Sequence, residues 1–151
     1  MQVIHTYSLF KDSKIASGEN SDCTVATLAS SFDISYDKAH AIAADLFQRK
    51  PKKGVIGSIL HSAMVDLKEK KTKINGKRVA KVYVTPTKDY KCNGRLVARK
   101  TRVKSFIKDN PEGTFYIVGN RHAMTIKDGV MIDNYREGSG GMIIRRAYQI
   151  K

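Results

Sequence analysis

The chain has 151 residues, a hydrophobic fraction of 41% and a net charge of +14, and these values exclude several classes of protein. The length fits one domain with a hydrophobic core, and the hydrophobic fraction excludes an intrinsically disordered chain. No apolar run approaches the roughly 20 residues of a membrane span, and the first residues lack a signal-peptide pattern, so we expect a cytoplasmic protein with no membrane association.

The positive charge is concentrated in the middle of the chain. Residues 1–47 hold three Lys/Arg against six Asp/Glu (−3), residues 48–108 hold nineteen against three (+16), and residues 109–151 hold six against five (+1). A concentrated cationic surface attracts polyanions and acidic protein surfaces. We therefore expect a single domain over 1–151 with a basic, insertion-like segment at about 48–108.

The first half of the sequence predicts helices. An irregular lead-in with a short strand near 3–9 precedes a helix over 22–31, whose start follows a run of capping residues. Ser35 is a typical N-cap for a second, amphipathic helix over about 36–48. A third helix is expected at about 56–71, because apolar residues recur there at helical spacing.

The second half changes to a β pattern. Residues 79–85 predict a strand, followed by a loop that contains Asn93-Gly94 and a short helix over 102–109 with Thr101 as its N-cap. Four short strands separated by glycine-containing turns are expected at 114–119, 122–126, 130–133 and 141–150. This order predicts an α+β fold, with N-terminal helices packed on a C-terminal antiparallel sheet.

Cys23 and His122 are the most informative pair in the sequence. Cys23 opens the first expected helix, where the first-turn amides and the helix dipole would stabilise a thiolate and an oxyanion. His122 begins a short strand at the rim of the expected sheet, a common place for chemistry. The structural alternatives are a small buried thiol and an ordinary strand histidine. A cysteine nucleophile needs a base and a third group that orients the base.

The candidate for the third group is a carboxylate or an amide on the return strand. If Asp128-Gly129 forms a two-residue hairpin turn, Asp133 becomes a diagonal neighbour of His122. The pairs expected in that register are Ile126 with Met131, Met124 with Asp133, and His122 with Tyr135. If the turn takes one more residue, Asn134 lies opposite His122 instead. Asp-Gly favours the first register, so Asp133 is the predicted third member and Asn134 the alternative.

Asn20 is the best side-chain candidate for an oxyanion donor, since it lies three residues before Cys23. The alternative role for Asn20 is a helix cap. The sequence contains no Cys-x-x-Cys or His-x-x-x-His spacing, and Cys23 and Cys92 are expected to be free thiols in a cytosolic chain. We therefore expect no metal and no cofactor.

These features resemble the papain-like cysteine peptidases. The resemblance is closest to the compact branch that includes the bacteriocin-processing (double-glycine) peptidases, and to small papain-like proteins encoded by bacteriophages. It covers about 16–47 and 101–150 of the chain. The matching residues are Asp22-Cys23, Leu28-Ala29, residues 35–40 and 110–118, His122-Ala123, Asp128-Gly129, Asp133 and Arg145-Arg146.

The resemblance implies a thiol-dependent hydrolase of amide bonds, with a protein or peptide as substrate and, for a bacteriophage protein, the host cytoplasm as its location. Cys23 would attack the carbonyl, His122 would act as base and then as acid, and Asp133 would orient His122. A peptidase, a deamidase and a transferase all share these steps. Papain-like peptidases place an oxyanion-binding Gln about six residues before the Cys, where this chain has Ser17, so Asn20 or a backbone amide would have to replace it.

The alternative function is a non-catalytic module of the same fold that binds nucleic acid or an acidic protein through its basic segment. The basic residues of this segment would neutralise phosphates and give salt-dependent affinity; a solvated surface that aids solubility is the alternative explanation. A third possibility is a hydrolase whose basic surface recognises an acidic or nucleic-acid-bound target. The expected polyanion-binding residues are Lys68, Lys70, Lys71, Lys73, Arg99, Lys100, Arg102 and Lys104.

Overall fold

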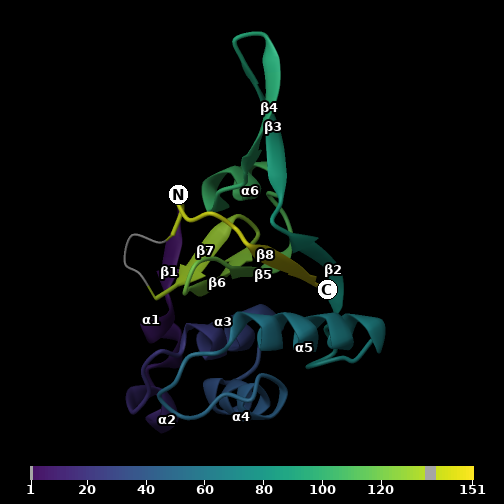
Figure 1. Ribbon diagram of the computed structural model, residues 1–151. Helices are drawn as coiled ribbons and strands as arrows, with labels where there is room; N and C mark the ends of the chain where they lie inside the picture. Colours follow the sequence, from purple (N-terminus) through teal and green to yellow (C-terminus); the bar gives the residue numbers. More distant parts are fainter. Residues whose placement is uncertain (1, 135–138) are drawn as a thin grey trace.

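A mixed six-stranded sheet forms the centre of the computed structural model, which describes residues 2–134 and 139–151 (Figure 1). The strands lie in the order β1-β7-β6-β5-β8-β2. Their bounds are Val3–His5 (β1), Val79–Val84 (β2), Thr114–Val118 (β5), Ala123–Lys127 (β6), Val130–Asp133 (β7) and Arg146–Ile150 (β8). The β1 strand is parallel to β7, whereas the other neighbouring pairs are antiparallel.

Helices cover both faces of this sheet. In Figure 1, α3, α4 and α5 lie on one side of the sheet and α6 lies on the other. The helices are Thr6–Phe10 (α1), Lys14–Ser17 (α2), Cys23–Phe32 (α3), Tyr36–Leu46 (α4), Gly57–Glu69 (α5) and Val103–Asp109 (α6). The mixture of helices and a sheet that the predicted α+β fold implies is therefore present, although one parallel N-terminal strand joins the expected antiparallel sheet.

Alternating side chains of β5 supply the two hydrophobic cores. Tyr116 is fully buried in the core shared with α3, α4 and α5. Phe115 and Ile117 point to the other face and pack in the core that contains Phe106 of α6. The rings of Phe106 and Phe115 meet edge to face, with centroids 5.0 Å apart. The period of two along a strand thus produces a sheet that is buried on both faces.

The central helix, α3, is the most buried helix of the fold, with every residue from 24 to 32 buried. Small and apolar side chains allow it to lie close against β5, β6 and β7. It ends at Asp33, which adopts a left-handed conformation (φ 53°) and donates its backbone N–H to the carbonyl of Ala29. This pattern is a common way to satisfy the last carbonyls of a helix.

The three helices expected in the first half are confirmed to within about two residues at each end. The lead-in differs from its expected strand at 3–9. Its strand ends at His5, whose Nδ1 accepts the backbone N–H of Tyr7 (3.1 Å) and so begins α1. The short helix α2 was not expected either, and it begins with the side-chain cap of Ser13.

The prediction of a loop around Asn93-Gly94 is wrong, because this stretch forms a β-hairpin. Its strands are Thr87–Cys92 (β3) and Arg95–Lys100 (β4), and they form a separate two-stranded sheet. Asn93 and Gly94 have positive φ (50° and 75°), as a two-residue hairpin turn requires. In Figure 1 the hairpin projects away from the rest of the molecule. Its strands lack an apolar face, so the periodicity that normally reveals a strand is absent.

The interval expected as an insertion-like segment, 48–108, is only partly separate from the domain core. Leu60, Met64 and Leu67 of α5 are buried in the core beneath the sheet, and β2 pairs with β8 at the sheet edge. Only the β3–β4 hairpin stands apart. Within residues 2–134 and 139–151, no helix has both the length and the apolar character needed to cross a bilayer.

Two further boundaries differ from the expectations for the second half. The strand expected at 141–150 begins only at Arg146, and Ile143 before it makes a single bridge with Arg102. Thr101 does not cap α6, because it lies one residue before the N-cap position. Its backbone N–H donates to the carbonyl of Pro86, and its carbonyl accepts the N–H of Ile144. Arg102 occupies the N-cap position without a side-chain cap bond.

Candidate active site

Cys23 is the first residue of α3 and lines a pocket of about 490 Å³. The residue before it, Asp22, occupies the N-cap position but makes no side-chain bond to the helix. The carboxylate of Asp22 instead accepts the hydroxyl of Tyr36 at 2.6 Å. Among the described residues, no side chain therefore caps the first turn of α3, which makes the backbone N–H of Cys23 a candidate donor to an oxyanion.

His122 lies on the same pocket, at the base of the hairpin that joins β5 to β6. The backbone N–H of Gly119 donates to the carbonyl of His122 at 2.9 Å, which closes a turn made by Asn120 and Arg121. Arg121 has positive φ (55°) within this turn. The tight turn fixes His122 immediately before a buried strand, and only 7% of the residue is exposed.

Asp133, at the end of β7, is the hydrogen-bond partner of His122. The distance from His122 Nε2 to Asp133 Oδ1 is 2.7 Å. The second carboxylate oxygen accepts the hydroxyl of Ser139, also at 2.7 Å. The carboxylate is fully buried. A buried carboxylate with both oxygens bonded is a rigid partner that orients the imidazole.

The two-residue turn at Asp128-Gly129 accounts for this pairing and confirms the expected register. Both turn residues have positive φ (48° and 79°), and Ile126 pairs with Met131 across the turn. The expected pairing of His122 with Tyr135 lies outside the described residues. Asn134, the alternative third member, is exposed and lines a different pocket, of about 250 Å³. The structure thus brings Asp133, and not Asn134, to His122.

The environment of His122 favours its protonated form. Burial alone would lower its pKa, but the interactions with Asp133 and with Cys23 outweigh burial and raise the pKa to about 9. His122 is therefore an imidazolium at neutral pH. Because its pKa is raised on folding, its stabilising contribution is complete below a pH of about 6.5 and is lost as the pH rises through about 9.

Asn20 does not share the pocket of Cys23 and His122. It is exposed, and its backbone carbonyl accepts a hydrogen bond from Arg49 at 3.2 Å. Ser17, which stands at the position of the expected oxyanion-binding residue, lines the other pocket together with Asp22. The expected role of Asn20 as an oxyanion donor therefore has no support in the geometry, which leaves the backbone N–H of Cys23 as the candidate donor.

A buried ionic cluster, which no sequence pattern predicted, holds the loop that precedes Cys23. The Glu19 carboxylate contacts Arg49 Nη1 at 2.6 Å and His40 Nε2 at 2.7 Å. It also accepts the backbone N–H of Lys52 at 2.7 Å. Burial would raise the pKa of Glu19, but these bonds outweigh burial and lower it. The partners come from distant parts of the chain, so no local sequence pattern could reveal them.

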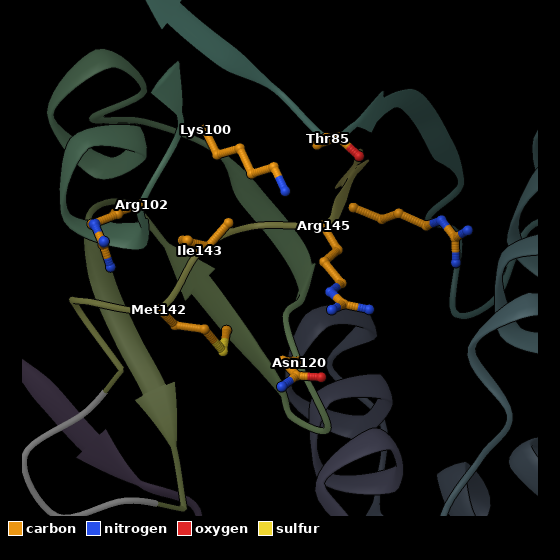
Figure 2. A pocket seen from close by; sticks show the side chains of 8 residues that line it. Thr85, Lys100, Arg102, Asn120, Met142, Ile143 and Arg145 are labelled. Atoms are coloured by element: carbon orange, nitrogen blue, oxygen red, sulfur yellow. The ribbon is translucent and has the colours of Figure 1, made fainter. Parts of the chain in front are cut away.

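The expected polyanion-binding residues do not form one surface. In Figure 1 the end of α5 lies at the opposite side of the molecule from the hairpin and α6. Lys68, Lys70, Lys71 and Lys73 belong to or follow the end of α5, whereas Arg99, Lys100, Arg102 and Lys104 belong to β4 and the start of α6. Two of these eight residues, Lys100 and Arg102, line a third pocket, of about 660 Å³ (Figure 2).

Comparisons of this chain with protein-family models, with curated proteins and with solved structures found no match. Across residues 2–134 and 139–151, no three His, Cys, Asp or Glu side chains gather as a metal-binding group. The chemical argument therefore depends on the geometry of Cys23, His122 and Asp133.

The Asp133 carboxylate should account for much of the raised pKa of His122. In the Asp133→Asn variant we expect the titration midpoint of His122, followed by the Hε1 proton in NMR, to fall from about 9 by roughly one to three pH units. Asp109→Asn removes one charge from an exposed carboxylate and should leave the midpoint unchanged. A wild-type midpoint near 6.5 would contradict the assigned pairing.

Removing only one partner of the Glu19–Arg49 pair should destabilise the fold more than removing both. We expect Arg49→Met to lower the free energy of unfolding by about 3–5 kcal/mol, because it leaves the buried Glu19 carboxylate without its main partner. The double variant Glu19→Gln/Arg49→Met should lose less, since no charge is then left unpaired. Lys70→Met, which breaks the exposed pair with Asp66, should cost less than about 0.5 kcal/mol. Urea unfolding measures all three, and equal losses in the single and double variants would disprove the explanation.

Proposed function

We propose that this protein is a papain-like, thiol-dependent hydrolase of amide bonds that acts through Cys23, His122 and Asp133. The observation that carries the proposal is the buried 2.7 Å contact between His122 and Asp133 on the pocket that Cys23 also lines. The effect of Cys23 on the pKa of His122 is further support, because it means that the two side chains interact. A nucleophile, a base and an orienting group are the three parts that thiol catalysis requires.

The proposed reaction begins with a thiolate at Cys23 and an imidazolium at His122. Since Nε2 of His122 contacts Asp133, Nδ1 is the nitrogen that exchanges the proton with Cys23. The sulfur attacks the amide carbonyl, a C–S bond forms, and the backbone N–H of Cys23 stabilises the oxyanion. His122 then protonates the leaving nitrogen, and the C–N bond breaks.

The second half of the reaction releases the acyl group. A water molecule gives a proton to His122 and attacks the thioester, the C–S bond breaks, and the carboxylic acid product leaves. A peptidase, a deamidase and a transferase share the acyl-enzyme and differ in the leaving amine or in the acceptor. The papain-like type is supported by the arrangement of a buried helix that begins at the cysteine and packs on the sheet that supplies the histidine and the acid. We also propose that the protein is related to the bacteriocin-processing peptidases and to the small papain-like proteins of bacteriophages, and that it is cytoplasmic.

The reactivity of Cys23 tests the proposed function. An ordinary thiol, with a pKa of about 8.5, is mostly unreactive at pH 6. We expect iodoacetamide to modify Cys23 at pH 6 at least about tenfold faster than Cys92, the exposed thiol of the same chain, because the imidazolium of His122 stabilises the thiolate. Mass spectrometry of the two peptides gives both rates in one sample. In His122→Ala the ratio should approach one.

The control for this experiment is His61→Gln, which alters a histidine that bonds to Tyr148 and does not line the pocket. This variant should keep the ratio of the wild-type protein. Incubation with p-nitrophenyl acetate should also place an acetyl group on Cys23 that disappears with time as water hydrolyses the thioester. Equal alkylation of Cys23 and Cys92 at pH 6 would rule out the proposed thiolate–imidazolium pair.

A second candidate function is the binding of nucleic acid by the β3–β4 hairpin. Residues 87–100 carry five Lys/Arg and one Asp, a net charge of +4, and nearly all of them are exposed. The hairpin also exposes Tyr90, Leu96 and Val97. A protruding two-stranded ribbon with this charge has the dimensions that the major groove of DNA admits.

Shortening the hairpin tests this second candidate. Lys88 and Arg99 are paired across it, so residues 89–98 can be replaced by Asn-Gly to give a hairpin that closes at that pair. We expect unfolding by heat to change little, because the removed side chains are exposed. For binding to a fluorescent DNA duplex, the slope of log affinity against log salt concentration should become shallower by about two, since Lys91 and Arg95 are removed. Lys71→Gln/Lys73→Gln is the control, and an unchanged salt dependence in the short hairpin would exclude this function.

A further inference from the structure

The pocket of Cys23 and His122 adjoins the larger pocket, of about 660 Å³, and the two are called the joined pockets below. The two share Asn120, Arg145 and Arg146 as lining residues. Figure 2 shows Lys100 and Arg145 extending into the larger pocket, with Asn120 on the turn that leads to His122. A chain bound at Cys23 would therefore have the larger pocket beside it.

The lining of the joined pockets is strongly cationic. Among the described residues, this lining contains no Asp or Glu, and its basic residues are Lys100, Arg102, Arg121, Arg145 and Arg146. None of these five forms an ion pair with a residue that the structure describes. Five cations of like charge around one depression repel each other, so an anionic ligand gains their combined attraction.

The cations of this lining differ in whether they hold the fold together. The side chains of Arg102 and Arg146 do so, because they donate to the backbone carbonyls of Gly141 and Gly57, respectively. Those of Lys100 and Arg145 have no hydrogen bond to the described residues, and both residues are exposed. Lys100 and Arg145 are thus available to a ligand and can be replaced without removing an internal contact.

We infer that the substrate is an acidic polypeptide segment, whose Asp or Glu side chains bind the cations of the larger pocket while the amide to be cleaved lies at Cys23. The inference rests on the proposed hydrolase function for the position of that amide. Guanidinium groups bind carboxylates through two parallel hydrogen bonds, which adds geometric selectivity to the charge attraction. Met142 and Ile143 supply an apolar wall for the aliphatic parts of the bound chain.

The same lining disfavours nucleic acid as the occupant. Single strands bind by stacking their bases on aromatic side chains beside a basic groove. No Phe, Tyr or Trp of residues 2–134 and 139–151 lines either pocket, whereas the exposed Tyr90 lies on the hairpin. A polypeptide also supplies the acyl carbon that a thiolate attacks.

Binding to the Cys23→Ala protein measures recognition without turnover. The probe is a fluorescein-labelled ten-residue peptide of alternating Glu and Ala, compared with the same peptide carrying Gln in place of Glu. We expect the acidic peptide to bind at least about tenfold more tightly, and Lys100→Gln/Arg145→Gln to weaken its binding about tenfold. Lys91→Gln/Arg95→Gln removes the same charge from the hairpin tip and should change the affinity less than about twofold.

Three results would overturn the inference. They are equal affinity for the two peptides, equal losses in the two charge variants, and tighter binding of a labelled ten-nucleotide oligothymidylate that Lys100→Gln/Arg145→Gln abolishes. The assay also separates this inference from the proposed function. Peptide binding without acylation of Cys23 in the wild-type protein would support the acidic ligand and overturn the hydrolase. Acylation without peptide binding would do the reverse.

Discussion

The packing of α3 against the sheet is the constraint on which the candidate site depends. Hydrogen bonds fix the position of the helix along the strands. Ser30 Oγ lies 2.6 Å from Thr125 Oγ1 on β6, and the hydroxyl of Tyr116 on β5 donates to the carbonyl of Thr24 at 3.1 Å. Because an α-helix is stiff, these contacts also fix its first residue, Cys23, at the end of β6 where His122 lies. The packing of the core therefore also determines where the two side chains of the candidate site lie.

Two buried ionic groups flank this site, and the burial of each carries a desolvation cost. The pair of His122 and Asp133 lies behind the pocket, and the cluster of Glu19 and Arg49 holds the loop before Cys23. Apolar side chains of similar volume often stabilise a fold as well as a buried ion pair does. The value of such pairs is in orientation, because charge-assisted hydrogen bonds restrict both partners to one geometry. Their position on either side of Cys23 agrees with a site whose geometry matters more than its contribution to folding.

The parts of the site that the sequence could predict are those encoded locally. The helix that begins at Cys23 follows from helical periodicity, and the Asp128-Gly129 turn sets the register that selects Asp133 over Asn134. The hairpin of β3 and β4 was missed because charged residues interrupt both faces of its strands, although Asn93-Gly94 was a valid turn signal. The contact of Glu19 with Arg49 joins residues 30 positions apart and depends on tertiary packing alone.

The cations of the joined pockets show why the net charges of the three chain segments did not predict where positive charge gathers in the fold. Residues 109–151 have a net charge of only +1, yet Arg121, Arg145 and Arg146 all line the joined pockets. Asp133 is buried against His122, and Asp109, Glu112 and Asp128 line neither pocket. Folding then adds Lys100 and Arg102 from the middle segment to the same wall. The middle segment therefore contributes cations to the pocket beside that of Cys23. The positive charge near Cys23 is explained by these residues, without a separate basic surface. An acidic substrate would use both parts of the chain at once, because the cations from the middle segment and from the strand end face one shared depression.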